Sequence, residues 1–567
     1  MKKLVSLVLI AFVVSACGQT APASTPTPVI VPVTVEVPIK QTVQVPVFIT
    51  PTPSFPQQLV RWSVEGISDL ATLDPPRIND AQGVFVAGLV FGGLVKLDAE
   101  LKVVPDAATW TVSDDDLRYT FKLRNGLRFS DGTPVTSDDV VFSLTRALDP
   151  ATGSTTGPFY LASIAGADDL TAGKVKELAG IQAVDPQTLQ ITLKQPSAFF
   201  LGQLTFASGY IVSKKQVQAN PATWAEKPAG TGPFLLKEWV RGQGLALAPN
   251  PNYYGAPLRL TEIQLPFFED SDAAFQAYRA GDLEVMGSQQ NGVPAARIPE
   301  VRDLPDLRTA SGFVVRYVGF NNTLKPFNDA RVRQAFARSI DKQALVDKVL
   351  GRTARPTDRI LPPGLPGSEF PIQSLSFNPD AAKKLLTDAG YPGGRGLGTL
   401  ALTYGKEGDN ERVVTFLQAQ WRDNLGVNVA LQPLELAAFS DRLSAMIQAP
   451  DQGLQFYYSV WGADYADPQN FLSQQLHTGV GNNNGHYSNA DFDRLADLAD
   501  ITSGDYIKRM KLYNQAEQIA VAEVGWLPLF NPTTNVLVRP YVQGLVLTGQ
   551  GIIVPDWSAV RGKVNMP

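Results

Sequence analysis

A proline-rich stretch near the N-terminus decides which part of this chain can form a globular core. From Ala21 to Pro56 the sequence is dominated by Pro, Thr and Val, and Glu36 and Lys40 are its only charged residues. Proline lacks a backbone donor and interrupts both helices and strand ladders. We therefore expect an extended tether, with an extra strand as the alternative because valine is frequent. The roughly 510 residues that follow are enough for two or three globular lobes.

The residues before this stretch have the pattern of a lipoprotein signal. Lys2 and Lys3 are followed by an apolar run from Leu4 to Val14 and then by small residues that lead to Cys17. The run is shorter than the about 20 apolar residues that span a bilayer. Cys17 is the only cysteine of the chain, so it has no partner for a disulfide or a thiolate metal site. We expect removal of residues 1–16 and lipidation of Cys17; an ordinary signal sequence that ends near a cysteine is the alternative.

Composition disfavours several classes of function. Lys and Arg total 49 and Asp and Glu total 54; without Lys2 and Lys3 the net charge is about −7, with no basic cluster. We therefore expect no nucleic-acid partner. The two histidines, His477 and His486, leave little material for histidine catalysis or a histidine metal site. We expect neither a metal nor a cofactor.

Alternating apolar residues predict strands in the first part of the globular region. Arg118 to Arg124 and Leu189 to Leu193 both alternate apolar side chains with polar or charged ones, as half-buried strands do. Between these strands Thr136 is placed to cap a helix with Asp139 as its third residue, and Pro150 ends that helix. This part of the chain is therefore predicted to mix strands and helices.

The later sequence predicts helices that alternate with strands. Apolar spacing and end signals predict helices over 329–350, 378–390, 411–425, 489–500 and 505–522. Alternation and apolar runs predict strands over 427–431 and 526–530. The fold class is therefore α/β, without an internal repeat of the kind found in solenoids.

Two glycine-containing segments are interpreted as structural. Ser130–Pro134 is predicted to form a tight turn in which Gly132 takes a positive φ. Ala229–Pro233 superficially resembles a phosphate-binding loop, but it lacks the required Lys-Ser/Thr pair. We expect this segment to begin a strand near a crossing between lobes.

Six motifs follow one another in an order that carries a family resemblance. They are TLDP at 72–75, VPDAATWTVSDDDLRYTFKLRNGLRFSDGTPVTSDDVVFSLTRALDP at 104–150, AGTGPFLLKEW and NPNYYG between 229 and 255, FNNTLKPFNDARVRQAFARSIDKQALVDKVLG from 320, NPDAAKKLLTDAGYPGG from 378 and WGADYADPQNFL from 461. Together they resemble the family 5 extracellular solute-binding proteins, which serve peptide and nickel ABC importers. The resemblance covers nearly the whole region after the tether.

The resemblance implies a fold and a domain order. The implied fold is a periplasmic-binding-protein-like clamp of two lobes (type II, cluster C) with an additional domain, which closes around its ligand by a hinge motion. The implied domains are the signal peptide, 1–16; the lipidated cysteine and tether, 17–56; lobe I, 57–98, 225–318 and 525–567; the additional domain, 99–224; and lobe II, 319–524.

The resemblance also implies a function. It implies the substrate-binding component of an ABC importer, which captures extracellular di- or oligopeptides and delivers them to a membrane permease. The implied protein is a monomer without catalysis, anchored through Cys17 on the outer face of the cell membrane, on its periplasmic or cell-wall side. Because relatives carry nickel chelates and oligosaccharides, these ligands remain alternatives.

The segment from Val460 to Pro468 carries the implied ligand site. In peptide-binding relatives the acidic residue that matches Asp464 pairs with the ligand's α-ammonium group, and the strand around Trp461 and Gly462 hydrogen-bonds the ligand backbone. Tyr465 is a candidate for an aromatic wall around ligand side chains. A turn-forming role is the alternative for Asp464, and core packing is the alternative for Trp461.

The basic residue that would bind a ligand carboxylate is less well defined. Some relatives place arginines shortly before the acidic motif, but no Arg or Lys lies between Arg442 and Asp464. Arg412 lies at an interval that resembles the arginine of dipeptide-binding members. Its place at the start of a predicted helix also permits a solvated surface role.

Two enzyme classes are weaker alternatives. Ser339 and Lys342 fit the S-x-x-K pattern of serine acyl-transferases, and 487–489 and 477–479 imitate the other two motifs. We expect Ser339 inside a helix rather than at its exposed start, and the other two motifs occur in the wrong order. A glycoside hydrolase needs two facing carboxylates, which the sequence neither supports nor excludes. We therefore expect binding rather than catalysis.

Overall fold

The structure, a computed structural model, describes residues 30–36, 42–48, 58–288, 291–449, 453–480 and 482–564. Its contacts divide the chain into two units, Met1–Pro56 and Gln57–Pro567. In the first unit β1 (Ile30–Glu36) and β2 (Thr42–Phe48) pair antiparallel. These two segments of the predicted tether are therefore paired strands rather than single extended chain. Cys17 and the predicted cleavage site lie outside the described residues.

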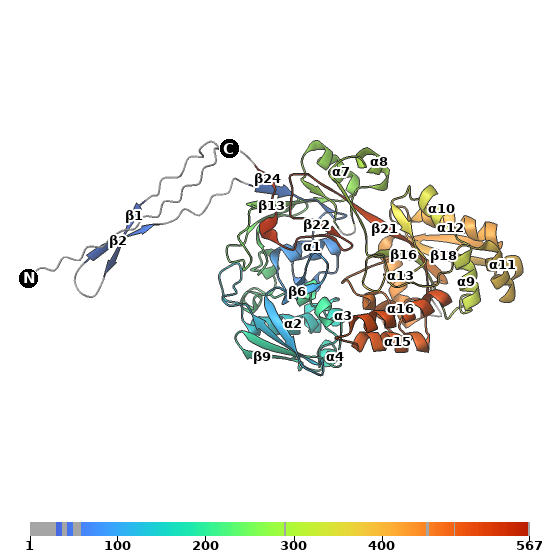
Figure 1. Cartoon of the computed structure of the whole chain (residues 1–567), viewed down its shortest axis with the longest axis horizontal. Helices are drawn as coiled ribbons and strands as arrows, with labels where there is room; N and C mark the ends of the chain where they lie inside the picture. Colours follow the sequence, from blue (N-terminus) through green and yellow to red (C-terminus); the bar gives the residue numbers. More distant parts are fainter. Residues whose placement is uncertain are drawn as a thin grey trace, which may run out of the picture. The chain divides into compact units, whose positions relative to one another are not determined.

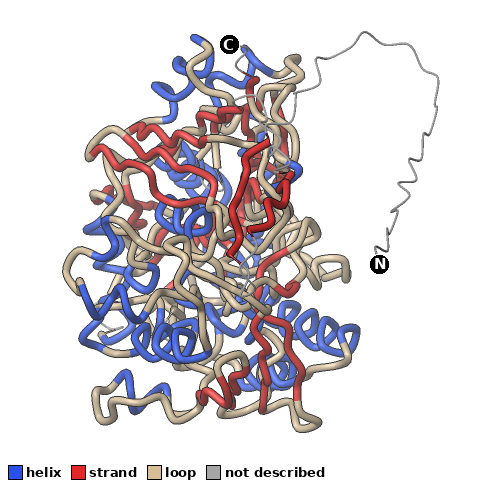
Figure 2. Tube along the Cα trace, turned by 90° about the vertical axis from the view of Figure 1, so that its left-hand side faces the viewer, coloured by secondary structure: helices blue, strands red, loops and turns tan. Residues whose placement is uncertain are grey.

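The second unit contains helices and strands throughout (Figures 1 and 2). Its first sheet has the order β11 (Phe234–Val240), β12 (Gly244–Pro249), β13 (Glu262–Phe268), β3 (Gln58–Arg61) and β24 (Lys563–Val564), and β4 (Val64–Glu65) also pairs with β13. β3 and β24 are adjacent and antiparallel. Segments from the beginning and the end of the unit thus share one sheet.

The second sheet is antiparallel and confirms the early strand predictions. Its order is β7 (Ala108–Val112), β8 (Arg118–Leu123), β10 (Thr188–Thr192) and β9 (Ile181–Asp185). The predicted helix between β8 and β10 is α2 (Ser137–Leu148). Its Asp139 carboxylate accepts the Thr136 N–H at 2.9 Å, which satisfies a donor at the helix start.

The third sheet is mixed and contains the strand that ends in the 461–464 motif. Its order is β14 (Val285–Met286), β21 (Trp526–Val538), β16 (Val314–Phe320), β20 (Phe456–Gly462), β18 (Thr399–Gly405) and β19 (Asn428–Leu434); β15 (Leu307–Ser311) and β17 (Ala354–Pro356) also pair with β21. β16 and β20 are antiparallel, whereas β18 is parallel to both of its neighbours.

Hydrophobic residues pack on both faces of this third sheet. Phe456 and Tyr458 of β20 belong to the same buried cluster as Trp421. Tyr457, between them, belongs to a second cluster that includes Tyr513, because successive side chains of a strand point to opposite faces. Figure 1 shows α12 and α16, the helices that carry Trp421 and Tyr513, on opposite sides of β16 and β18. The central strands are therefore covered on both faces.

Most of the later helices lie where the sequence predicts them. They are α11 (Pro379–Asp388), α12 (Asn410–Leu425), α15 (Ala490–Ile501) and α16 (Tyr506–Glu523). Gly426 ends α12 with a positive φ of 71°, a conformation that glycine adopts without steric cost. The Asn378 side chain accepts the Ala381 N–H at 3.0 Å and so caps α11. Local end signals were sufficient to place these helices.

The predicted helix over 329–350 is wrong in one respect, because the structure has two helices there. These are α9 (Ala330–Arg338) and α10 (Lys342–Lys348). The Asp341 side chain accepts the Ala344 N–H at 2.9 Å and caps a new helix. Apolar spacing continues across the break because Phe336 and Leu345 enter the same buried cluster. Spacing alone therefore concealed the interruption.

The last predicted strand is longer than expected. Its apolar run ends at Phe530, but β21 continues to Val538 and pairs with β17 and β15 beyond that point. The polar segment from Thr533 to Asn535 lines a large cavity. The polar residues beyond the predicted end of the strand therefore belong to the part of β21 that lines the cavity.

The segment Ala229–Pro233 packs against the end of α1 (Ala81–Val90). A Cβ atom on Gly230 would lie 2.0 Å from the carbonyl oxygen of Val90. The Gly232 N–H donates to the same oxygen at 2.9 Å. β11 begins directly afterwards, as predicted, and the glycines permit this close approach of two backbones.

The remaining strands and helices complete the second unit. The strands are β5 (Val95–Leu97), β6 (Val103–Pro105), β22 (Val546–Thr548) and β23 (Gly551–Ile553). The helices are α3 (Gly157–Tyr160), α4 (Ala167–Thr171), α5 (Phe200–Gln203), α6 (Lys214–Ala219), α7 (Ser271–Ala280), α8 (Ile298–Val301), α13 (Leu436–Gln448) and α14 (Ser473–Leu476). Within the described ranges, none of the helices has both the length and the apolar character needed to cross a membrane.

A half-buried carboxyl group of α15 makes the stability of the second unit sensitive to pH. The Asp500 Oδ1 atom accepts the Tyr513 hydroxyl at 2.5 Å and the Ser473 hydroxyl at 2.7 Å. Burial is the largest influence on this group and raises its pKa from 3.8 to about 7, although both hydroxyl groups lower it. Folding therefore favours the protonated form of Asp500.

We expect Asp500→Asn to remove part of this pH dependence. Because the pKa of Asp500 is higher in the folded than in the unfolded protein, ionisation of this group lowers the free energy of unfolding as pH rises from about 4 to about 7. Asparagine keeps an acceptor for both hydroxyls and carries no charge. Urea unfolding should give a variant about 2 to 4 kcal/mol more stable than the parent at pH 8, with little difference at pH 4. The exposed Asp380→Asn is the control, and an Asp500→Asn curve parallel to the parent's would contradict the prediction.

Candidate ligand-binding site

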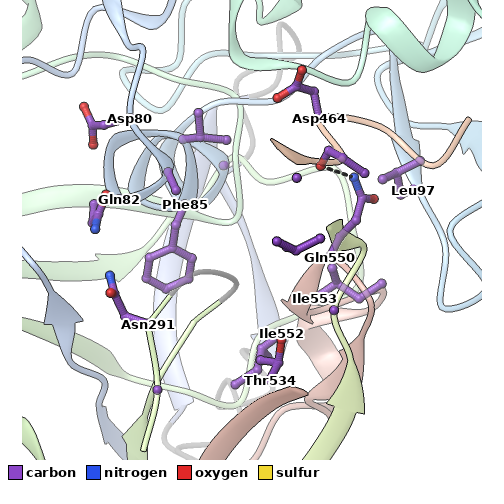
Figure 3. Close-up of a pocket in the computed structure, with 18 of the residues that line it drawn as sticks. Asp80, Gln82, Phe85, Leu97, Asn291, Asp464, Thr534, Gln550, Ile552 and Ile553 are labelled. Atoms are coloured by element: carbon purple, nitrogen blue, oxygen red, sulfur yellow. Dashed lines mark hydrogen bonds between the residues drawn. The ribbon is translucent and has the colours of Figure 1, made fainter. Parts of the chain in front are cut away.

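A cavity of about 1060 Å³ is lined by segments that lie far apart in the sequence. One wall comes from α1 and the residues around it, another from β16, β20 and β21, and a third from the hairpin of β22 and β23. Figure 3 shows Gln82 and Phe85 of α1 across the cavity from Asp464 and Gln550. Binding sites for small ligands commonly have volumes of about 300 to 1000 Å³, so this cavity is large enough for a ligand of several residues.

The 461–464 motif contributes a continuous part of the cavity wall. Five consecutive residues, from Val460 to Asp464, line the cavity. Three of the predicted site residues, Trp461, Gly462 and Asp464, are therefore brought together there. β20 ends at Gly462, so the Asp464 side chain lies just beyond the end of a central strand.

Asn470 fixes the geometry of this motif and was not found from the sequence. Its side-chain oxygen accepts the Asp464 N–H at 3.0 Å, and its side-chain nitrogen donates to Asp464 Oδ2 at 3.1 Å. Its main-chain oxygen accepts the Trp461 indole N–H at 2.8 Å. Asn470 is fully buried. It is the last residue of a short 3-10 helix, Pro468–Asn470, and its position six residues after Asp464 was the only available signal.

The carboxylate of Asp464 is half-buried and contacts neutral donors. Besides Asn470, the hydroxyl of Tyr160 in α3 hydrogen-bonds to it. Burial is the largest influence and raises the pKa of Asp464, whereas both hydrogen bonds lower it. Burial also raises the pKa of Tyr160, and the neighbouring Asp464 raises it further. A cationic group of a ligand would therefore supply charge compensation that Asn470 and Tyr160 do not.

Tyr465 does not line the cavity, contrary to its predicted role in an aromatic wall. Its side chain is buried, and its ring packs edge-on against Tyr160 with centroids 6.4 Å apart. Its hydroxyl donates to the side chain of Gln469. The chain turns after Gly462, so Asp464 and Tyr465 face different surroundings. Aromatic residues that do line the cavity include Trp62, Phe85, Tyr210, Tyr254 and Trp461.

Arg412 does not itself line the cavity, although its partner Asp409 does. Its guanidinium group donates to Asp409 Oδ1 at 2.7 Å and to the main-chain oxygen of Val349 at 2.6 Å. The Arg412 side chain is 60% exposed. The first turn of α12 directs it outward, so its position supports the surface role that the sequence left open.

The wall formed by the hairpin of β22 and β23 includes a glutamine that sequence reasoning missed. Gln550 follows β22, and its side-chain nitrogen donates to the main-chain oxygen of Ala463 at 3.3 Å (Figure 3). Its side-chain oxygen is buried and has no hydrogen-bond partner among the described residues. No pattern in the sequence distinguishes this glutamine from those on the surface.

The residues of the proposed acyl-transferase pattern are placed unfavourably for catalysis. Ser339 is fully buried at the end of α9, and its hydroxyl donates to the Phe336 carbonyl at 2.9 Å. Lys342 forms an ion pair with Asp358 at 2.5 Å rather than contacting Ser339. Neither residue lines the cavity. Among the residues that the structure covers, no group of three His, Cys, Asp or Glu side chains is arranged to hold a metal ion.

Comparison with known protein families determines the class of this protein. Residues 102–483 match the bacterial extracellular solute-binding proteins, family 5. The chain belongs to this family. The resemblance that the six motifs indicated is therefore confirmed, and so is the α/β fold of periplasmic binding proteins, although the exact lobe boundaries stay a prediction.

Relatives of this family 5 protein differ in the ligands that their names record. The chain is 32% identical to the probable deoxycholate-binding periplasmic protein YgiS of Escherichia coli, over 88% of this chain and 92% of that protein. It is 30% identical to the periplasmic oligopeptide-binding protein OppA of Salmonella typhimurium, over 84% and 88% of the two chains.

Solved structures of the family have the same fold. The unliganded open form of the murein tripeptide-binding protein MppA superposes with a TM-score of 0.73 at 27% identity, over 88% of this chain and 99% of that chain. An oligopeptide-binding protein of Borrelia burgdorferi, OppAIV, superposes with a TM-score of 0.74 at 28% identity, over 89% of this chain and all of that chain.

Proposed function

We propose that this solute-binding protein captures peptides outside the cell and delivers them to the permease of an ABC importer. The observation that carries the proposal is the half-buried Asp464 carboxylate at the end of β20, in the wall of the cavity. A peptide supplies the two features that this arrangement requires, a cationic terminus and an extended backbone. Family membership supports the transport role, and relatives named for oligopeptides and tripeptides support the ligand class.

One edge of β20 is open where it borders the cavity. β16 pairs with β20 along its whole length, from Phe456 to Gly462. On the other side β18 pairs only as far as Tyr458, because β18 ends at Gly405. The backbone from Ser459 to Gly462 therefore lacks a neighbouring strand on that side within the described part of the chain. An extended peptide can add to such an edge through main-chain hydrogen bonds, which do not depend on its side chains.

Asp464 would fix the register of a peptide bound along this edge. Its carboxylate lies just beyond Gly462, where the α-ammonium group of the peptide would come close to it. An ion pair with hydrogen bonds in a desolvated site is stronger than a neutral hydrogen bond. The same contact is not available to a neutral oligosaccharide, which makes the sugar alternative less suited to this site.

We further infer that the protein acts by binding rather than catalysis, and that Cys17 carries a lipid anchor on the outer face of the cell membrane. The buried position of Ser339 supports the first inference. The signal pattern that precedes Cys17 supports the second. We expect the protein to work as a monomer that meets its permease at the membrane surface.

Native mass spectrometry of the second unit, purified without denaturation, tests the ligand class. We expect the protein to carry a mixture of short peptides, which can be released by acid and sequenced. Release of a bile acid, a sugar or a metal chelate instead would keep the family assignment but contradict the peptide proposal. Addition of a synthetic peptide mixture to refolded protein provides the control for loss of ligand during purification.

A further inference from the structure

An arginine of the third sheet lines the same cavity as Asp464. Arg316 of β16 lies opposite Val460 of β20 in the antiparallel register. Its side chain is 23% exposed, so the guanidinium group is partly withdrawn from water. The hydroxyl of Tyr458 hydrogen-bonds to it. The sequence predictions for a carboxylate-binding residue concerned Arg412 and the segment before Asp464, and Arg316 lies much earlier in the chain.

The contacts of Arg316 place its guanidinium group beside the end of β18. Its Nη1 atom donates to the Asn410 side-chain oxygen at 3.3 Å. The Asn410 side-chain nitrogen donates in turn to the main-chain oxygen of Gly405 at 2.9 Å. Gly405 is the last residue of β18. Because β18 stops there, a peptide added to the open edge of β20 would have its far end close to Arg316.

The other basic residue known to line the cavity is already engaged elsewhere. Lys96 of β5 donates to the main-chain oxygen of Pro555 at 3.2 Å. Its charge also acts on two carboxyl groups: Asp106, whose pKa burial raises on balance, and Asp556, whose pKa is lowered mainly by hydrogen bonds from Ser558. Among the described cavity-lining residues, Arg316 is therefore the better placed cation for a ligand bound along β20.

The spacing between Arg316 and Asp464 corresponds to a short peptide. Asp464 lies four positions after Val460, the partner of Arg316, and four steps of about 3.3 Å give about 13 Å. An extended tetrapeptide has about this length, and a tripeptide can span it because both protein side chains reach inward. The loop from Lys406 to Asp409 joins β18 to α12 and would obstruct a longer extended peptide.

We propose that Arg316 binds the C-terminal carboxylate of the peptide, and that its spacing from Asp464 selects peptides of three or four residues. This inference deepens the proposed function and rests on it. Glu407 is the group that competes for Arg316, because its carboxylate lies 4.0 Å from the guanidinium group. That distance is long for an ion pair and Glu407 is 51% exposed, so a ligand carboxylate can replace it at small cost.

Calorimetric titration of the full chain with alanine peptides of two to six residues tests this inference. Each peptide is used both as the free acid and as the C-terminal amide. We expect the parent to bind the tripeptide and tetrapeptide acids most tightly, and about tenfold to a hundredfold more tightly than their amides, as for a hydrogen bond to a charged group. Arg316→Gln should lose this preference for the acid while its affinity for the amides stays within about twofold, which also shows that the variant is folded.

Two further variants separate the role of Arg316 from a general effect of charge. Arg316→Lys should retain part of the preference for the acid. Arg422→Gln, on the exposed face of α12, should leave both affinities unchanged, since Arg422 is 62% exposed and pairs with Asp423. If Arg316→Gln still prefers the acid, the role of Arg316 is overturned but the proposed function is not. If the dipeptide or the hexapeptide binds most tightly, the selection of three or four residues is overturned. A parent that binds none of the peptides would overturn the proposed function as well.

Discussion

Replacement of Asp464 by alanine is expected to reduce peptide affinity by about 2 to 5 kcal/mol. The substitution removes the negative partner and leaves the peptide's α-ammonium group desolvated without compensation. It also removes the acceptor for the Asn470 side-chain N–H, which lies 3.1 Å from Asp464 Oδ2. Calorimetry with a tetrapeptide at pH 7 gives the change directly. An affinity within twofold of the parent's would remove Asp464 from the ligand site.

Matched variants distinguish loss of charge from loss of shape. Asp464→Asn keeps a side chain of the same size, so a loss nearly as large as that of Asp464→Ala would assign the effect to the charge. Asp168→Ala, whose side chain is 81% exposed, should not affect binding. Because burial raises the pKa of Asp464, affinity should also decline with falling pH at a higher pH than for an exposed aspartate.

Much of the fold could be predicted from local sequence signals. The helices that begin at Pro379 and Asn410 follow clear end signals, and the strands at Arg118 and Thr188 follow strict alternation. The predictions failed where tertiary contacts override a local pattern. The break at Ser339 is hidden because both flanking helices pack on one core, and the length of β21 is hidden because its polar half lines a cavity.

The candidate site was predicted only where its residues are contiguous in sequence. Trp461, Gly462 and Asp464 form one segment, so the family motif identified them together. Arg316 and Gln550 reach the same cavity from β16 and from the turn after β22. Strand register and loop packing bring them there, and neither can be derived from periodicity. The direction of a side chain at a turn cannot be derived from the sequence either, which is why Tyr465 was wrongly predicted to line the site.

The second large effect is expected at a buried carboxylate that holds a long loop onto α16. Glu517 is fully buried. Its Oε1 atom accepts the main-chain N–H groups of Ile360 and Leu361 at 2.9 and 2.8 Å, and Oε2 accepts the Arg359 guanidinium at 2.5 Å. Arg359 also donates to the main-chain oxygen of Phe370 at 3.1 Å. One carboxylate thus accepts two buried main-chain N–H groups and also holds the Arg359 guanidinium group.

Glu517→Ala should lower the free energy of unfolding by about 3 to 5 kcal/mol, because it leaves a buried guanidinium group and two main-chain N–H groups without their acceptor. Glu517→Gln retains one acceptor oxygen and should cost less. Lys384→Ala, which breaks an exposed pair with Asp388 at 2.6 Å, should change stability by less than about 0.5 kcal/mol. Urea denaturation of all three variants measures these differences. A Glu517→Ala variant as stable as Lys384→Ala would contradict the prediction. The buried carboxylate would then contribute no more to stability than an exposed ion pair does.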